Sequence, residues 1–242
     1  MNATELILQF AASEGGSFMK RDLLSRMEET TFSPSYINLA LSRMVKSGAL
    51  TKSGRGQYQI SDGKKDFAPK LDSLSLELAE FFNKNLPFTR YCIYEGEWIN
   101  PFMHHLAGNH LHYLEVEREA MDSVFERITT LGRTAYLRPD REFMYRYVDI
   151  HNSTAIIVKP LISESPLISV DSIPCPTMEK LIVDISKDPD FDYLQGSEFL
   201  HVLNNIKRIY RINEPRLLRY ASRRSVREAI ANALRETDHD ID

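Results

Sequence analysis

The sequence predicts two domains: a small one of short helices and a β-hairpin, followed by a larger α/β or α+β domain. Within the first 60 residues, apolar residues at helical spacing end at a glycine and give way to two short extended runs. After residue 72, strand-like apolar runs alternate with amphipathic helical stretches. The expected division is therefore a small domain at 1–62, a polar linker at 63–72 and a larger domain at 73–242.

Two short helices open the small domain, over Ala3–Ser13 and Lys20–Glu28. The pair Gly15-Gly16 separates them, because glycine is a poor helix former. Thr30–Ser33 then forms the turn into a third helix. Each helix has apolar residues on one side, which predicts an inward face. The expected inward residues are Leu6, Ile7, Phe10, Leu23, Leu24 and Met27.

A third helix is predicted between Ser33, a good N-cap, and Gly48, a typical C′ glycine. Pro34 suits its first position. Apolar residues at helical spacing define its buried face, namely Ile37, Ala40, Leu41, Met44 and Val45. The opposite face, with its flanks, is mostly polar and holds Ser35, Tyr36, Asn38, Leu39, Ser42, Arg43 and Lys46.

Two extended runs, Ala49–Thr51 and Gln57–Ile60, follow the third helix and predict a β-hairpin. Its tip contains two glycines and two cations, Lys52 and Arg55. Alternation allows Tyr58 to point inward as part of the core. Three short helices and a basic hairpin within 60 residues are typical of a winged helix-turn-helix domain.

A mostly polar helix face followed by a basic hairpin suits major-groove reading with backbone contacts from the hairpin. The predicted partner is double-stranded operator DNA, with a possible homodimer on DNA because one winged helix makes a short base-reading surface. A solvated helix face and a protein-interaction module without a nucleic-acid role remain alternatives. The predicted DNA-binding residues are Ser35, Tyr36, Asn38, Ser42, Arg43, Lys46, Lys52 and Arg55.

The charge is unevenly distributed along the chain. Residues 1–65 hold nine Lys and Arg against six Asp and Glu, a net of +3, whereas the remainder holds 21 against 28, a net of −7. A small cationic domain on an acidic body is compatible with local DNA binding. No apolar run of about 18 residues and no secretory signal are evident, so we expect a cytoplasmic protein without a membrane span.

The larger domain is predicted to contain four strands and five helices. The expected strands are Tyr91–Tyr94, Leu111–Val116, Ala135–Leu137 and Ala155–Ile162. The expected helices are Ser73–Asn83, Ala120–Leu131, Met178–Lys187, Glu198–Tyr210 and Glu214–Glu236.

Glu115 and Glu117 are the candidate catalytic pair. Carboxylates at alternate strand positions hold magnesium in nucleotidyltransferases and nucleases. Neither full motif is present, since no Gly-Ser helix start precedes the pair and position 119 is Glu where a nuclease needs Lys. We therefore expect no enzyme activity and no cofactor, with a nuclease-like or nucleotidyltransferase-like enzyme as the alternative.

Histidines and cysteines give weak signals. His104, His105, His110 and His112 invite a metal hypothesis, but adjacent histidines on a strand point oppositely. No Cys or carboxylate at ligand spacing completes a set, so no metal is predicted. Cys92 and Cys175 are expected to be ordinary buried thiols.

A stripe of arginines marks the last predicted helix. Arg216, Arg219, Arg223 and Arg227 share one face, with Arg224 beside it. Like charges at this spacing disfavour a helix, so an anionic group should offset them. Local acids such as Glu214 and Glu228 are one candidate, and DNA or an acidic partner is the other.

The chain resembles the AbiEi-type antitoxins, the winged-helix regulators of bacterial type IV toxin–antitoxin systems. The resemblance rests on the N-terminal pattern, on Pro176–Ile185 with its Glu179-Lys180 pair, and on Glu214–Val226 with its Arg223-Arg224 pair. It implies a prokaryotic autorepressor that counteracts a nucleotidyltransferase-like toxin. It also implies partner or anion contacts from Glu179, Lys180, Arg216, Arg219, Arg223, Arg224 and Arg227.

Overall fold

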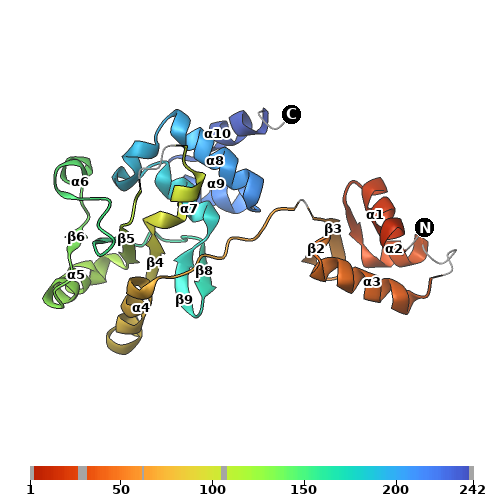
Figure 1. The fold of residues 1–242 in the computed structure, drawn as a ribbon, viewed down its shortest axis with the longest axis horizontal. Coiled ribbons are helices and arrows are strands. Elements are labelled where there is room, and N and C mark those ends of the chain that lie inside the picture. The colour runs from red at the N-terminus through yellow and green to blue at the C-terminus, as the bar shows by residue number, and fades with distance from the viewer. Residues whose placement is uncertain (1–2, 27–31, 62, 105–107, 240–242) are drawn as a thin grey trace. The chain divides into compact units, whose positions relative to one another are not determined.

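A computed structural model describes residues 3–26, 32–61, 63–104 and 108–239. Its internal contacts divide the chain into two compact units, Met1–Lys65 and Asp66–Asp242. The class is mixed α/β, with several small sheets (Figure 1). None of the helices within the described ranges is both long and apolar enough to cross a membrane.

The described residues of the N-terminal unit form three helices and a three-stranded antiparallel sheet in the order β1-β3-β2. Strand β1 was not expected, because three residues between two helices are too few to show alternation. The predicted positions of Met27 and of Thr30 and Thr31 lie outside the described residues. The elements are α1 (Ala3–Ser13), β1 (Ser17–Met19), α2 (Lys20–Arg26), α3 (Pro34–Lys46), β2 (Leu50–Gly54) and β3 (Gln57–Ile60).

Helix α3 begins where its sequence predicts, and Ile37, Ala40, Leu41 and Met44 of its predicted apolar face are buried. The Ser33 hydroxyl accepts a hydrogen bond from the Tyr36 N–H at 3.3 Å, and Gly48 takes a left-handed φ of 78° after the helix. Tyr58 is buried and its ring stacks on Phe18 at 5.8 Å, so it belongs to the core. The fully or largely buried residues of this unit include Ile7, Ala11, Leu23, Ile37, Ala40, Leu41, Met44 and Leu50.

The C-terminal unit is built on a four-stranded sheet in the order β4-β5-β7-β6. Strands β5, β7 and β6 run parallel to one another, and β4 is antiparallel to β5. A separate hairpin of β8 and β9, which the sequence analysis missed, follows the sheet. The strands are β4 (Tyr91–Glu95), β5 (His112–Val116), β6 (Ala135–Leu137), β7 (Ile156–Pro160), β8 (Leu167–Val170) and β9 (Ile173–Pro176).

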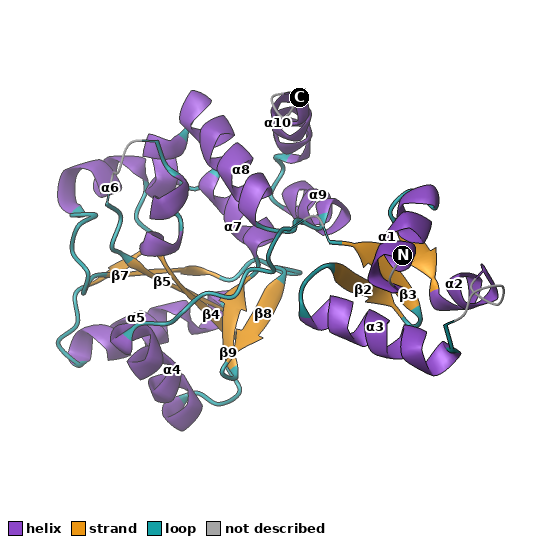
Figure 2. Cartoon of the chain, turned by 45° about the vertical axis from the view of Figure 1, so that its right-hand side comes forward, coloured by secondary structure: helices purple, strands orange, loops and turns teal. Residues whose placement is uncertain are grey.

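Seven α-helices lie among the described residues of this unit and cover the sheet on both faces (Figure 2). Helices α4 and α5 pack on one face with the hairpin, over Ile93, Leu114 and Val158. The other face, with Tyr94 and Tyr113, packs against the helices that follow the hairpin. The helices are α4 (Ser73–Asn85), α5 (Met121–Thr130), α6 (Arg141–Tyr147), α7 (Met178–Ile185), α8 (Ser197–Ile209), α9 (Glu214–Arg223) and α10 (Arg227–His239), with short 3₁₀ helices at Gly96–Trp98, Asn100–Phe102, Arg118–Ala120 and Pro189–Leu194.

The helix predicted over Glu214–Glu236 is wrong as one element. It consists of α9 and α10, which are separated by a turn in which Ser225 has a φ of 59°. No Gly or Pro lies at this break in the sequence. Because the helical periodicity continues through it, the sequence analysis predicted a single helix.

The predicted linker at 63–72 is also corrected. Phe67 packs edge-on against Trp98 and Tyr210, at ring-centroid distances of 5.9 and 5.5 Å. Asp72 caps α4, because its side chain accepts a hydrogen bond from the Ser75 N–H at 2.8 Å. The later part of the polar stretch therefore belongs to the packed C-terminal unit.

Candidate functional site

The exposed face of α3 and the β2–β3 hairpin form a cationic surface in the N-terminal unit. Residues 32–61 contain four Lys and Arg and no Asp or Glu. These four cations, Arg43, Lys46, Lys52 and Arg55, are all exposed. Because the segment that holds them contains no acid, their charges reinforce one another at this surface.

None of these cations makes an ion pair with another described residue of the unit. Lys52 lies over the Tyr58 ring, with 5.9 Å between its Nζ and the ring centroid, which orients the side chain without neutralising it. A surface of unpaired cations is suited to phosphate oxygens, for which no protein acid then competes.

The predicted polar contacts lie on the same helix face as Arg43 and Lys46. Ser35, Asn38 and Ser42 are exposed, and Tyr36 is 47% exposed while its ring stacks on Phe32. Leu39 is 46% exposed on this face. The helix therefore offers hydroxyl, amide and apolar groups together, which are the groups that read base edges.

Local acids pair with two of the four arginines of the stripe. Arg216 Nη1 lies 3.8 Å from Glu179 Oε2, and Arg223 Nη2 lies 3.4 Å from Glu164 Oε1. Arg219 and Arg227 are exposed and have no ion pair with the described residues. The alternative in which local acids offset the stripe thus describes part of it, with Glu164 and Glu179 in place of the expected Glu214 and Glu228.

The predicted partner contacts from Glu179, Lys180 and Arg224 require correction. Glu179 is 5% exposed and Lys180 is fully buried. The Arg224 side chain is 13% exposed and pairs with Asp188. Glu179 and Lys180 are buried because α7, which begins at the Thr177 N-cap, is buried along its whole length, whereas Arg224 at the end of α9 is turned toward Asp188.

Lys180 forms the first part of a buried charge network. Its Nζ donates to Glu115 Oε1 at 2.7 Å and to an Asp184 oxygen. Tyr220 donates its hydroxyl proton to the other Asp184 oxygen at 3.0 Å. Although burial acts to lower the pKa of Lys180, its carboxylate neighbours raise it well above the ordinary value, so the ammonium stays charged.

Lys159 forms the second part, and the sequence analysis did not single it out. Its Nζ donates to Asp188 Oδ2 at 2.7 Å and to Asp190 Oδ2 at 2.8 Å. Arg224 joins the two parts, since it bonds to Asp188 and its Nε lies 3.5 Å from Asp184 Oδ1. A lysine at the end of an apolar strand was the one sequence signal that could have indicated this group.

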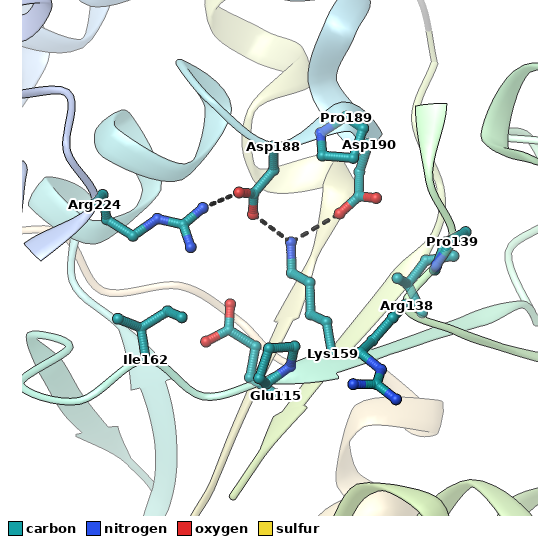
Figure 3. Close-up of a pocket in the computed structure, with 11 residues that line it drawn as sticks. Glu115, Arg138, Pro139, Lys159, Ile162, Asp188, Pro189, Asp190 and Arg224 are labelled. Atoms are coloured by element: carbon teal, nitrogen blue, oxygen red, sulfur yellow. Dashed lines mark hydrogen bonds and ion pairs between the residues drawn. The ribbon is translucent and has the colours of Figure 1, made fainter. Parts of the chain in front are cut away.

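The network opens into a pocket of about 230 Å³ at the carboxyl edge of the parallel strands, hereafter the carboxyl-edge pocket (Figure 3). Glu115 on β5 is in register with Lys159 on β7, and Arg138 directly follows β6. Ligands of α/β sheets bind at this edge of the strands. The lining residues are Glu115, Arg138, Pro139, Ile157, Lys159, Pro160, Ile162, Asp188, Pro189, Asp190 and Arg224.

Polar atoms in and beside the network lack a hydrogen-bond partner among the described residues. Glu115 Oε2 and the Tyr94 hydroxyl are buried without a hydrogen-bond partner. Burial raises the pKa of Glu115, against the opposing effect of Lys180. It also raises the pKa of Asp190. Unpaired buried polar atoms are uncommon in folded proteins, and shifted carboxyl groups gather where ligands bind.

Glu117 does not join Glu115. Strand β5 ends at Val116, and Glu117 Oε1 accepts a hydrogen bond from the Arg90 N–H at 3.3 Å. Glu117 lines a different surface depression from the one that holds Glu115. The two carboxyl groups thus have different hydrogen-bond partners, Lys180 for Glu115 and the Arg90 N–H for Glu117, and a paired-carboxylate catalytic site stays a prediction.

The described histidines are dispersed. His110 pairs with Glu97, and the His104 ring packs edge-on against His201 at 5.1 Å. His105 lies outside the described residues. His112 is the histidine that lies beside two carboxylates, those of Asp72 and Glu95, and neither spacing nor periodicity indicated this.

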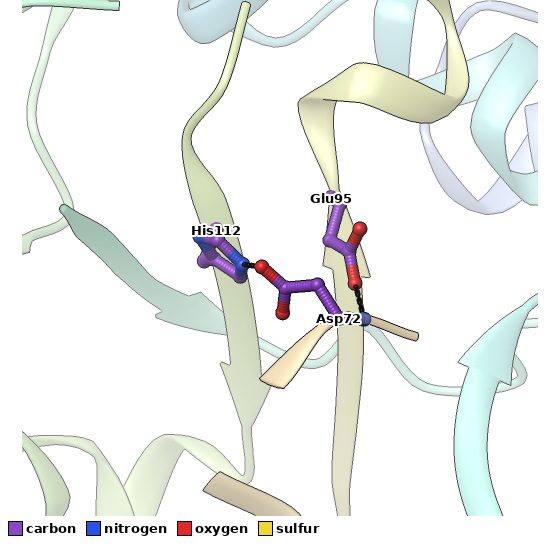
Figure 4. A group of neighbouring side chains, drawn as sticks. All are labelled: Asp72, Glu95 and His112. Atoms are coloured by element: carbon purple, nitrogen blue, oxygen red, sulfur yellow. Dashed lines mark hydrogen bonds and ion pairs between the residues drawn. The ribbon is translucent and has the colours of Figure 1, made fainter. Parts of the chain in front are cut away.

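Asp72, Glu95 and His112 are the one group within the described ranges whose ligand atoms all lie within 4.8 Å of one another (Figure 4). His112 Nε2 lies 2.9 Å from Asp72 Oδ2. Glu95 Oε1 accepts from the Asp72 N–H at 2.9 Å and from the Ser75 hydroxyl at 2.8 Å. These residue types could hold a divalent metal. Asp72 is also the N-cap of α4, and His112 Nδ1 is buried without a hydrogen-bond partner in the described part of the chain.

The chain is thus a two-unit α/β protein with a cationic helix–hairpin surface and a polar pocket at the carboxyl edge of a parallel sheet. Residues 36–240 match DUF6577, a family of unknown function, and the chain belongs to that family. The match includes α3 from Tyr36 onward, the β2–β3 hairpin and nearly all of the C-terminal unit. None of the curated proteins compared with the chain matches its sequence.

Proposed function

We propose that the protein is a transcriptional regulator whose N-terminal unit binds double-stranded operator DNA as a winged helix-turn-helix domain. The observation that carries the proposal is the acid-free segment 32–61, in which the exposed face of α3 and the tip of the hairpin hold four cations without ion-pair partners in the unit. Helix α3 reads the major groove, and the β2–β3 hairpin is the wing.

The order of elements supports the same proposal. Three helices and an antiparallel hairpin whose second strand also pairs with β1 suit a winged helix. The buried side of α3, with Ile37, Leu41 and Met44, fixes the helix on its unit and leaves the polar side free. A solvated face without a ligand would not require a segment of 30 residues to exclude every acid.

Specific binding requires two copies. One α3 helix contacts a short run of base pairs, so paired half-sites on the operator and a homodimer on DNA follow. The resemblance to AbiEi-type antitoxins extends the proposal to an autorepressor in the cytoplasm that counteracts a nucleotidyltransferase-like toxin. We propose no enzyme activity for the chain itself.

An electrophoretic shift assay with the protein's own promoter tests the DNA proposal. Arg43→Ala and Lys46→Ala should each weaken binding by about 1–3 kcal/mol, the cost of a lost base or phosphate contact. Lys187→Ala, which removes an exposed cation from the C-terminal unit, is the control and should bind as the wild type. Unchanged affinity of both α3 variants would refute the proposed surface.

A co-expression growth assay tests the antitoxin extension separately. The protein should restore growth when the toxin gene beside its own gene is expressed. Absence of such a gene, or failure to restore growth, would remove the antitoxin role and leave the DNA-binding proposal standing.

A further inference from the structure

We propose that the carboxyl-edge pocket binds a small organic cation, a molecule that carries a primary ammonium group. The acceptors are Glu115 Oε2 and the second oxygen of Asp190. This inference concerns the C-terminal unit and does not depend on DNA binding.

The geometry supplies an acceptor that is already built and unused. Glu115 is 2% exposed, and Lys180 holds its Oε1, so the carboxyl group is fixed in place. Its Oε2 has no partner, and Figure 3 shows the group turned into the space between Lys159 and Ile162. Asp190 uses one oxygen for Lys159 and has the other available in the pocket lining.

The balance of buried charge favours a cation. The network contains four carboxylates, Glu115, Asp184, Asp188 and Asp190, and three cations, Lys159, Lys180 and Arg224. On formal charges the buried network therefore carries one excess negative charge, not counting Arg138, which is exposed in the pocket lining. An uncompensated buried charge is costly, so a ligand that supplies a positive charge gains by entering.

The same contacts disfavour an anion in the depth of the pocket. Lys159 and Lys180 each bond to two carboxylates, and Arg224 lies against Asp184 and Asp188. Because these three cations are already paired with carboxylates, a phosphate that entered would be repelled by the carboxylates and would find no unpaired cation among the three. Arg138, which lines the pocket and is exposed, is the lining cation that has no ion pair with a described residue.

Aromatic rings surround the ammonium of Lys159 on the protein side of the pocket. The Nζ of Lys159 lies 5.5 Å from the Tyr94 ring centroid, 5.0 Å from that of Tyr113 and 5.7 Å from that of Phe191. Ring faces attract ammonium groups, so these rings help to hold the Lys159 ammonium, and none of the three lines the pocket itself. The volume of about 230 Å³ is smaller than the roughly 300–1,000 Å³ of pockets for drug-sized molecules, which points to a ligand of amine or amino-acid size.

Isothermal titration calorimetry on the full chain with three probes of one chain length tests the proposal. The probes are putrescine, 1,4-butanediol and succinate, which carry ammonium, hydroxyl and carboxylate ends on four-carbon chains. Putrescine should bind, and the other two should not. Binding of succinate in preference to putrescine, or binding of none of the three at millimolar concentration, would overturn the proposal.

Two matched variants locate the binding. Glu115→Gln should weaken putrescine binding about ten- to hundredfold, as expected for the loss of one charge-assisted hydrogen bond. Glu117→Gln removes the same charge two residues away, outside the pocket, and should bind as the wild type. Equal weakening in both variants would mean that putrescine binds to the acidic surface in general and would refute the site.

A second variant keeps the test valid if Glu115→Gln does not fold. If circular dichroism shows that Glu115→Gln has lost its fold, Asp190→Asn takes its place with the same expected loss. Full-strength binding in a folded Asp190→Asn variant would then count against the proposal.

Discussion

The two units use charged side chains in opposite ways. In the N-terminal unit, Arg43 and Lys46 stand exposed on α3 with no acid in their segment. In the C-terminal unit, Lys159 and Lys180 are buried and each bonds to two carboxylates. Exposed, unpaired cations contribute little to folding and are available for a partner, whereas buried, paired ones are structurally coupled to their neighbours.

The largest effect that this comparison predicts is on stability. Lys180→Met should destabilise the C-terminal unit by about 3–5 kcal/mol, because it leaves the buried Glu115 without its cation and Asp184 with Arg224 alone. Lys46→Met should change the free energy of unfolding by less than about 0.5 kcal/mol, as an exposed residue does. Urea unfolding of both variants tests this difference. A similar loss of unfolding free energy in the two variants would contradict the proposed contrast between the units.

The acid dependence of stability should follow the same network. Burial acts to raise the pKa of Asp188, but Lys159 and Arg224 outweigh it and hold the pKa below its ordinary value. A carboxyl group with a lowered folded-state pKa stabilises the protein above its unfolded-state pKa, and this contribution is lost as the pH falls through the folded-state pKa. Asp188→Asn should therefore flatten the loss of stability below about pH 4, the ordinary range of an aspartate. Urea unfolding at several pH values checks this prediction. If the free energy of unfolding of Asp188→Asn falls as steeply below about pH 4 as that of the wild type, the prediction is contradicted.

Arginines of the α9 stripe allow a finer test. Arg224→Ala should cost about 1.5–3 kcal/mol, since it removes a charged hydrogen bond to the buried Asp188. Arg219→Ala, one helical turn or so earlier and exposed, should stay within about 0.5 kcal/mol. Thermal unfolding of the two variants distinguishes a structural arginine from a surface one, and equal effects would show that burial does not separate them.

The smallest predicted stability effect concerns the cap of α4. Asp72→Ala removes the acceptor for the Ser75 N–H and the contact with His112, and should cost about 1 kcal/mol. Asp72→Asn keeps a capping side chain and should lose less. If Asp72→Ala unfolds at the same urea concentration as the wild type, the cap does not contribute to stability.

Local sequence signals predicted much of the N-terminal unit. The N-cap Ser33, the glycine Gly48 and the apolar spacing from Ile37 to Met44 all act within a few residues of one another. The exposed cations of α3 followed from the same periodicity, and those of the hairpin from its glycine-containing tip. Strand β1 was missed because its pairing with β3 depends on residues about 40 positions away in the chain.

The carboxyl-edge pocket could not be predicted in the same way. Lys159 lies on β7, whereas Asp188 and Asp190 come from the start of the 3₁₀ helix Pro189–Leu194, so their association depends on the tertiary packing of the segment after α7 against the sheet. The pair Glu179-Lys180 was noticed through the family resemblance, but its burial was not. Alternation in β5 suggested Glu117 as the companion of Glu115, while the structure supplies Lys180 from 65 residues further on.

The salt dependence of DNA affinity tests the central claim most directly. Fluorescence anisotropy with a promoter duplex should give a log affinity that falls linearly with log salt, since cations displace counterions from phosphates. Combined replacement of Lys52 and Arg55 by Ala should reduce the slope by about 2, one for each lost phosphate contact, and leave sequence preference nearly intact. The matched variant with Arg219 and Arg223 replaced should keep the wild-type slope. A slope that is unchanged by the hairpin replacements but reduced by the α9 replacements would contradict the assignment of DNA binding to the N-terminal unit.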